Sequence, residues 1–132
     1  MALQLLVVTP ERRVLEAEAD EVELPGSQGY LGILPGHAPL ITLLGTGVLS
    51  LRRGGSTTAY AVSAGFAEVS GDRVSVLADS AEAAGEIDAA SAERERSKAE
   101  EEMKTAGVDT LDGIRSRLEL AQARLAVARR PS

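Results

Sequence analysis

The character of the sequence changes near residue 86. Before that point, short apolar segments alternate with turns that contain glycine or proline, and no segment has the 3.6-residue period of a helix. After that point, β-branched residues become rare, and Ala, Glu and Arg dominate as they do in helices. The sequence therefore predicts two units, a β-rich domain over residues 1–85 and a helical one over residues 86–132.

Turn residues divide the first unit into short strands. Gly54-Gly55 follows the segment 48–53 and Gly71-Asp72 follows the segment 66–70, and glycine accepts the positive φ that tight hairpin turns require. Such turns recur about every eight to twelve residues, a spacing typical of β-sandwiches and barrels. We therefore expect an all-β N-terminal β-sandwich.

The first helix is expected to start after Asp88, a favourable N-cap residue, and to run to about Ala106, where Gly107 can end it. Its apolar stripe is rich in alanine. The stripe consists of Ala92, Ala99, Met103 and Ala106, and Arg96 interrupts it.

The second helix is expected to be capped by Asp109 or Thr110 and to reach about Arg130, because Pro131 cannot continue it. Its apolar residues recur at spacings of three and four, in the order Leu111, Ile114, Leu118, Ala121, Leu125 and Ala128. The connection is short, so the helices form a C-terminal antiparallel two-helix hairpin. Because alanine buries little area, we expect the pairing to contribute only a few kcal/mol, at about 25 cal/mol per Å².

Charge also separates the two helices. Residues 86–102 contain seven acidic and three basic side chains, whereas residues 113–132 contain five arginines and a single carboxylate, Glu119. A weakly paired hairpin with a basic last helix could detach and bind an acidic partner. The simpler interpretation is a stable hairpin with a solvated charged face, and the pattern alone favours it slightly.

Composition excludes several classes of function. A net charge of −6, a pI near 4.8 and a near absence of aromatic residues argue against nucleic-acid binding, which uses basic patches and stacking aromatics. The chain has no cysteine, so disulfides and thiol chemistry are excluded. The apolar run at residues 3–8 is too short for a signal-peptide core or a membrane span, and we expect a cytoplasmic location.

The residues needed for catalysis are missing. His37 is the only histidine, no serine lies in a G-x-S-x-G turn, and no phosphate-binding glycine loop is present. One histidine without cysteine cannot supply the nitrogen and sulfur ligands of a zinc site. We therefore expect no catalytic residue, no metal site and no enzymatic activity of the chain by itself.

The most informative segment covers residues 24–47. It contains the string Gly-Tyr-Leu-Gly-Ile-Leu-Pro-Gly-His-Ala-Pro-Leu-Ile-Thr at positions 29–42. Further blocks are Gly-Phe-Ala-Glu-Val at 65–69, Val-Leu-Ala-Asp-Ser-Ala-Glu at 76–82 and Ile-Asp at 87–88. In this order the blocks closely resemble the epsilon subunit of bacterial and chloroplast F-type ATP synthases, over most of residues 20–88.

The resemblance implies a β-sandwich followed by a helical hairpin, in agreement with the pattern of the residues. It also implies a non-catalytic rotor subunit of the central stalk, which couples rotation of the c-subunit ring to the gamma subunit and the catalytic head of a proton-translocating ATP synthase. The implied location is peripheral, on the cytoplasmic face of a bacterial inner membrane, with the chloroplast thylakoid as the less favoured alternative.

Contact residues carry over from the family position by position. The implied c-ring contact consists of Ser27, Gln28, Gly29 and Tyr30. Many relatives have an acidic residue where this chain has Tyr30, so the contact is expected to be less electrostatic here. The implied gamma contact consists of His37, Thr42 and Thr9. For each position, the alternative is a loop or strand residue without direct contact.

In the family, the helical hairpin can extend along gamma and obstruct rotation in the direction of hydrolysis. The resemblance therefore implies that arginines of the last helix meet acidic segments of the beta subunits in the alpha/beta catalytic head. These arginines are Arg115, Arg117, Arg124, Arg129 and Arg130.

Some relatives bind ATP on the compact hairpin through a motif that reads Ile/Leu-Asp-x-x-Arg-Ala. Here residues 87–92 read Ile-Asp-Ala-Ala-Ser-Ala, so Ser91 replaces the arginine and a charge-assisted donor is lost. The matches that remain are Glu82, Asp88 and Ala92, and we expect ATP binding to be weak or absent. The alternative is that Asp88 is simply a helix cap.

Two other classes of function stay open. A β-sandwich adaptor or binding module with a helical tail fits every compositional fact, and stable co-purification with a gamma subunit would distinguish the rotor subunit from it. An enzyme that uses His37 is the second alternative, and activity that survives His37→Ala would exclude it.

Overall fold

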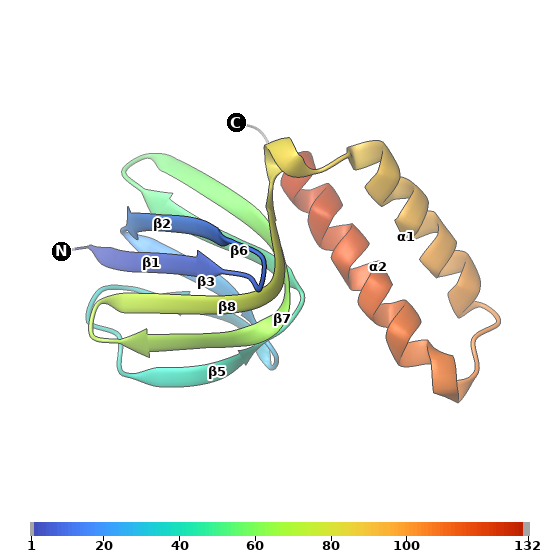
Figure 1. Ribbon diagram of the computed structural model, residues 1–132, viewed down its shortest axis with the longest axis horizontal. Helices are drawn as coiled ribbons and strands as arrows, with labels where there is room; N and C mark the ends of the chain where they lie inside the picture. Colours follow the sequence, from blue (N-terminus) through green and yellow to red (C-terminus); the bar gives the residue numbers. More distant parts are fainter. Residues whose placement is uncertain (1, 131–132) are drawn as a thin grey trace.

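The computed structural model describes residues 2–130, which form eight β-strands, one short 3-10 helix and two α-helices. The strands are β1 (Leu3–Val8), β2 (Arg13–Ala19), β3 (Glu21–Gly26), β4 (Gly29–Ile33), β5 (Leu40–Leu44), β6 (Gly47–Arg53), β7 (Ser56–Ser70) and β8 (Arg73–Ala83). They are followed by η1 (Ala84–Glu86), α1 (Ala89–Met103) and α2 (Val108–Ala128). Figure 1 shows the strands in one lobe and the helices beside it, which confirms the predicted β-sandwich and two-helix hairpin.

The longest strand, β7, joins the two layers of the sandwich. Residues 56–62 pair with β6, whereas residues 65–69 pair with β5, and β8 runs antiparallel along both parts. Strands β1 and β2 continue the sheet beyond β8, and β3 and β4 continue it beyond β6. The partner of β7 changes next to Gly65, whose backbone lies against the Leu77 carbonyl.

The sandwich has a hydrophobic core of its own. Every residue of the main buried cluster lies between Leu3 and Ala81, so none of them comes from the helices. The largest fully buried side chains of this cluster are Leu3, Leu5, Leu24, Ile33 and Leu49. They alternate along their strands with exposed or half-buried residues, as expected for a two-layer β-structure.

The two glycine turns predicted from the sequence are confirmed. Gly54 has a φ of 60° in the β6–β7 turn, and Gly71 has a φ of 61° in the β7–β8 turn. Both angles lie in the left-handed region, which glycine adopts without steric cost.

Helix α1 starts as predicted and ends earlier. The Asp88 side chain accepts a hydrogen bond from the Ser91 N–H at 3.1 Å and so caps the helix. The α-helix ends at Met103 rather than near Ala106, because the next N–H groups bond to carbonyls three residues back. Such bonds tighten the last turn into a 3-10 form.

Helix α2 starts two residues earlier than a cap at Asp109 would allow, and three residues earlier than a cap at Thr110. Gly107, with an extended backbone, is its N-cap, and the N–H groups of Thr110 and Leu111 bond to the Gly107 carbonyl. The prediction of Asp109 or Thr110 as the cap was therefore wrong. The helix starts after Gly107, which has no side chain to form a cap. The helix ends at Ala128, and the predicted stop at Pro131 lies outside the described residues.

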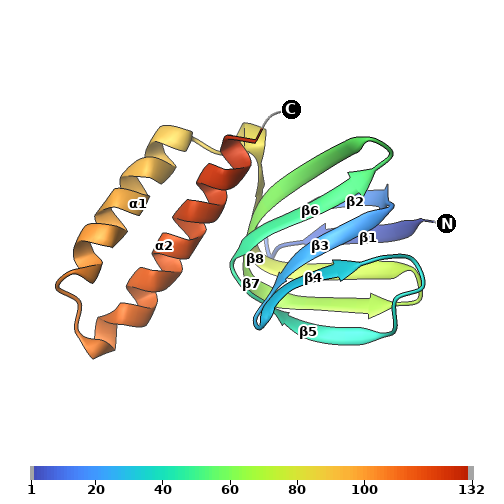
Figure 2. The ribbon, with the colours of Figure 1, turned by 180° about the vertical axis from the view of Figure 1, so that it is seen from behind.

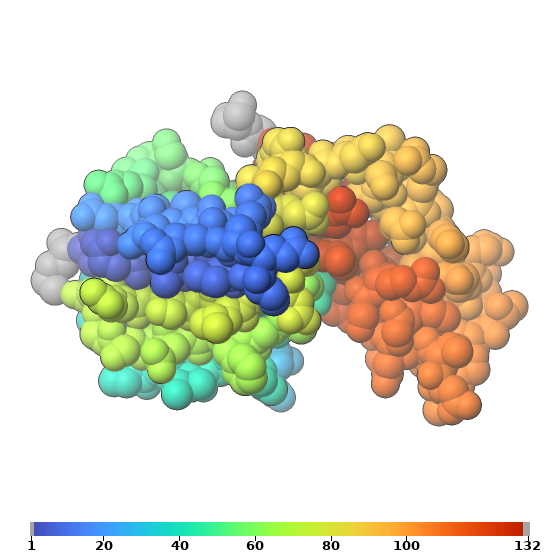
Figure 3. Space-filling model, in the orientation of Figure 1, coloured from blue at the N-terminus to red at the C-terminus, as the bar shows by residue number. Residues whose placement is uncertain are grey.

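Helix α2 lies between the sandwich and α1, as the ribbons in Figures 1 and 2 show from opposite sides. In the space-filling view of Figure 3, the helices form a lobe packed directly against the strands. Ala123 and Val127 of α2 pack against Ala59 and Ala61 of β7. The predicted apolar seam contains neither Ala123 nor Val127. The seam follows a single face of α2, whereas the helix also buries a second face against the sandwich.

Candidate functional site

An apolar patch covers part of the outer face of the sheet formed by β5, β7 and β8. In the register of the sheet, Leu43 lies opposite Phe66, and Phe66 lies opposite Leu77. Each of the three side chains is 56% exposed, and the nearby Ile41 is 72% exposed. We call these four residues the apolar patch. A row of exposed apolar side chains across three strands is typical of a surface that binds a partner.

The apolar patch continues into a cavity of about 350 Å³ at its edge. Phe66 and Leu77 form one side of this cavity, and Val8, Thr9 and Pro10 form another. The Thr9 hydroxyl accepts a hydrogen bond from the Arg12 N–H at 3.3 Å, which holds the turn after β1 in place.

The three residues predicted to contact gamma are not gathered in one place. Thr9 shares the cavity with Phe66 and Leu77. Thr42 lies between Ile41 and Leu43 on β5, so its side chain is on the opposite face of the strand. His37 lies in the loop before β5, where its Nδ1–H donates to the Ala38 carbonyl at 2.7 Å.

Our sequence reasoning missed the apolar patch, although a signal for it exists. Strand β5 reads Leu-Ile-Thr-Leu-Leu and is therefore apolar on both faces. A strand of a two-layer sandwich buries only one face within its own domain, so a second apolar face indicates an external partner.

The segment predicted to contact the c ring, residues 27–30, comprises the turn after β3 and the first two residues of β4, and it is exposed. Gly29 has a φ of 130°, which favours glycine at this position. The hydroxyl of Tyr30 accepts a hydrogen bond from the Val48 N–H at 3.0 Å, although 55% of the residue is exposed. Gly26 pairs with Leu44 at the end of β5, so this turn and His37 lie at opposite ends of that strand.

One ion pair connects the last helix to the sandwich. Arg124 Nε of α2 lies 2.9 Å from Glu82 Oε1 of β8, and Arg124 Nη2 donates to Glu82 Oε2 at 3.3 Å. The side chains are only 22% and 27% exposed, which makes this pair the least exposed in residues 2–130. The pair thus joins Glu82, which was predicted to take part in ATP binding, to Arg124, which was predicted to take part in inhibition.

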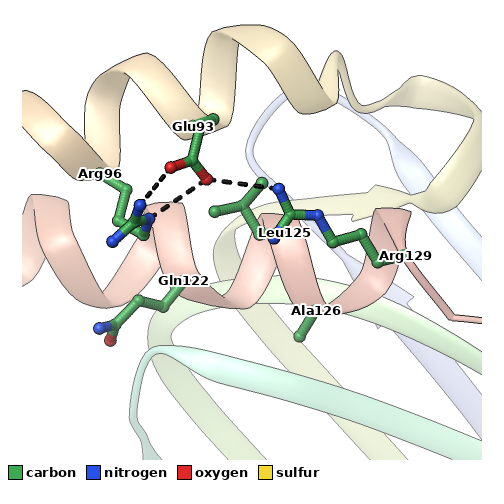
Figure 4. A pocket seen from close by; sticks show the side chains of 6 residues that line it. All are labelled: Glu93, Arg96, Gln122, Leu125, Ala126 and Arg129. Atoms are coloured by element: carbon green, nitrogen blue, oxygen red, sulfur yellow. Dashed lines mark hydrogen bonds and ion pairs between the residues drawn. The ribbon is translucent and has the colours of Figure 1, made fainter.

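A second polar cluster lies between the two helices and borders a cavity of about 430 Å³, seen in Figure 4. Glu93 of α1 accepts hydrogen bonds from Arg96 of the same helix and from Arg129 of α2, the latter at 3.4 Å. The hydrogen bond from Arg96 lowers the pKa of the Glu93 carboxyl, and the charges of Arg96 and Arg129 act in the same direction.

The residues that match the ATP motif have other partners in this structure. Asp88 caps α1, Ala92 is fully buried, and Glu82 is paired with Arg124. None of the three lines the cavity between the helices. Weak or absent ATP binding stays a prediction.

Acid is expected to destabilise the hairpin through Glu93. A carboxyl whose pKa is lowered in the folded state adds stability above its unfolded pKa, and this contribution is lost as the pH falls through the folded value. The ordinary pKa is 4.5, so the loss should occur below that pH. In thermal melts followed by circular dichroism, Glu93→Gln should flatten the loss of stability below pH 4.5. Glu95→Gln, on the exposed side of α1, should keep the wild-type slope, and identical slopes for all three proteins would contradict the assignment.

Two negative observations complete the description of residues 2–130. Within this range, no three histidine or carboxylate side chains are arranged to hold a metal ion. Neither helix in the range is both long enough and apolar enough to cross a membrane.

Comparison with known proteins places this architecture among subunits of one enzyme. A family model described as the ATP synthase delta/epsilon chain, beta-sandwich domain, matches residues 2–84. The ATP synthase epsilon chain of Solibacter usitatus is 48% identical over 128 residues, which are 96% of this chain and 95% of the relative. The epsilon chain of Herpetosiphon aurantiacus is 45% identical over 131 residues, covering 98% of this chain and 96% of the relative.

Two solved structures have the same fold. A chain of the mitochondrial ATP synthase of Euglena gracilis has a TM-score of 0.82 at 21% identity, covering 95% of this chain and 80% of that one. A chain of the Tetrahymena thermophila mitochondrial ATP synthase, in a structure of the central stalk and c ring, has a TM-score of 0.62 at 12% identity, with 96% of both chains covered.

Proposed function

The chain belongs to the family of ATP synthase epsilon chains, and from that premise we propose that it is a rotor element coupling the c ring to gamma and the catalytic head. As an epsilon chain it is a non-catalytic subunit of the ATP synthase central stalk. This membership argues against both alternatives, the adaptor module and the enzyme that uses His37. The Tetrahymena relative was solved with a central stalk and c ring, which supports the proposed position.

The apolar patch carries the proposal that residues 1–85 bind gamma. Three half-exposed apolar side chains form a row and continue into a cavity beside Thr9. Burying this row against a partner would remove apolar surface from water without changing the sandwich. The contacts expected at His37 and Thr42 stay predictions.

The exposed turn at residues 27–30 is the proposed c-ring contact. It lies at the end of the sandwich where β3 and β4 meet, and it presents Ser27 and Gln28 as hydrogen-bonding side chains. The bond between Tyr30 and the Val48 N–H holds the aromatic ring against the sandwich.

We propose that residues 86–132 regulate the enzyme by inhibiting ATP hydrolysis when the hairpin extends. The interface between α2 and the sandwich supports this role, because its buried residues are mainly alanine. Such residues bury little apolar area, so the hairpin can leave the sandwich at a modest cost in free energy.

The deciding experiment is ATP hydrolysis by an epsilon-depleted catalytic head, titrated with the full chain and with residues 1–86. The shorter chain keeps the whole main core of the sandwich and is expected to fold. We expect hydrolysis to fall stoichiometrically with the full chain only. If neither chain lowers the rate of hydrolysis and both still bind gamma, the coupling role stands and the inhibitory role is refuted.

Replacing the arginines of the last helix by alanine should relieve inhibition and leave assembly intact. The set is Arg115, Arg117, Arg124, Arg129 and Arg130, and the reason is loss of the positive face that meets an acidic partner. The matched control replaces five arginines outside that helix: Arg13, Arg52, Arg53, Arg73 and Arg94. Inhibition that is equal in both variants, measured by the same titration, would refute the role of the helix charge.

A further inference from the structure

Four of the five arginines proposed to inhibit hydrolysis have carboxylate partners within the chain itself. Three of them pair with residues of a different element: Arg117 with Glu102 of α1, Arg124 with Glu82 of β8, and Arg129 with Glu93 of α1. A fourth, Arg115, lies 3.9 Å from Asp112 of the same helix.

These pairs connect the parts that must separate when the hairpin opens. Glu82 connects α2 to the sandwich, whereas Glu93 and Glu102 connect α2 to α1. The apolar contacts between α2 and the sandwich come from small side chains. One charged pair therefore holds α2 to the sandwich, and two hold α2 to α1.

We propose that the compact hairpin masks itself: Glu82, Glu93 and Glu102 hold α2 in place by occupying the arginines that an acidic partner would otherwise bind. This inference rests on the proposed inhibitory function and adds its regulation. Release of the hairpin is then an exchange, in which carboxylates of the partner replace carboxylates of the chain. The number of ion pairs changes little in this exchange. Removing a few charges from the chain is therefore enough to shift the equilibrium between docked and detached hairpin.

The three pairs do not contribute equally. Salt screens exposed pairs more strongly than partly buried ones, and an exposed pair changes an equilibrium by at most about fivefold. Glu82 and Arg124 are the least exposed of the three pairs, whereas Arg129 is 63% exposed. Glu82 is therefore expected to have the largest effect on docking.

The test measures the docked fraction in the full chain by distances between two spin labels. The chain has no cysteine, so Ser70→Cys in the sandwich and Ser97→Cys on α1 introduce two labelling sites at exposed positions. The test variant is E82Q/E93Q/E102Q. The control is E23Q/E95Q/E119Q, which removes three exposed carboxylates that form no ion pair within residues 2–130.

We expect the test variant to raise the ratio of detached to docked hairpin about tenfold, whereas the control keeps the wild-type ratio. An equal ratio in both variants would overturn the proposal. A second variant, Glu82→Arg with Arg124→Glu, exchanges the charges and should restore docking relative to Glu82→Arg alone. Failure of that rescue would also count against the pair.

The inhibition titration separates this proposal from the function on which it rests. The test variant should inhibit hydrolysis at a lower concentration than the control, because more of it is detached. A raised detached fraction with unchanged inhibition would support the masking pairs and refute the inhibitory role. Far-ultraviolet circular dichroism should show the same helix content in all variants, since no substitution removes a helix cap or a buried apolar side chain.

Discussion

Gly65→Ala is expected to destabilise the sandwich by about 3 kcal/mol or more, because the strand has no room for a side chain there. A Cβ at this position would lie 1.8 Å from the Leu77 carbonyl oxygen and 2.9 Å from its carbon. Both atoms belong to the backbone of β8, and the pairing of Gly65 with Ala78 holds that backbone in register. The clash can be relieved only by parting the two strands at the point where β7 joins the layers.

Urea unfolding of the full chain measures this effect. The matched control is Gly113→Ala in α2, where a Cβ would meet nothing within 4 Å. That substitution should stabilise the helix by about 0.5 to 1 kcal/mol, because alanine loses less backbone entropy than glycine. The opposite result would be a free energy of unfolding for Gly65→Ala that differs from the wild type by less than about 1 kcal/mol, the size of the control's effect. It would show that β7 and β8 can move apart at little cost.

Phe66→Ala is expected to weaken binding to gamma by about 30-fold or more. The residue lies at the centre of the apolar patch, between Leu43 and Leu77, and borders the cavity lined by Thr9. Truncation of a central aromatic anchor in an interface costs about 2 to 4 kcal/mol, and each 1.4 kcal/mol is about tenfold in affinity. Because Phe66 is 56% exposed in the free chain, the stability of the sandwich should change far less.

Isothermal titration of gamma with the full chain provides the measurement. Val108→Ala is the control, since Val108 is 93% exposed and lies at the start of α2, in the helical lobe rather than on the strands of the apolar patch (Figure 1). Thr42→Val tests the earlier expectation for that residue, whose side chain is on the opposite face of β5. If Phe66→Ala binds gamma with wild-type affinity and Thr42→Val binds more weakly, the contact lies on the other face of β5 and not on the apolar patch.

The features that the sequence determined by itself are local ones. The glycine turns at residues 54 and 71 depend on one backbone angle each, and the cap at Asp88 depends on a hydrogen bond across three residues. The change from strands to helices near residue 86 follows from the period and composition of short windows. Such signals need no knowledge of distant neighbours, so they could be read along the chain.

The features that only the tertiary structure decided depend on contacts between distant segments. Strand β5 is apolar on both faces, and only the packing of the folded chain leaves Leu43 exposed and Leu44 buried. Glu82 and Arg124 are 42 residues apart, and they meet because α2 folds back onto β8. Helix α2 likewise buries a second face, because it lies between α1 and the sandwich. Periodicity along a helix or strand shows which side chains share a face, and the neighbour that covers this face is set by the packing of the whole chain.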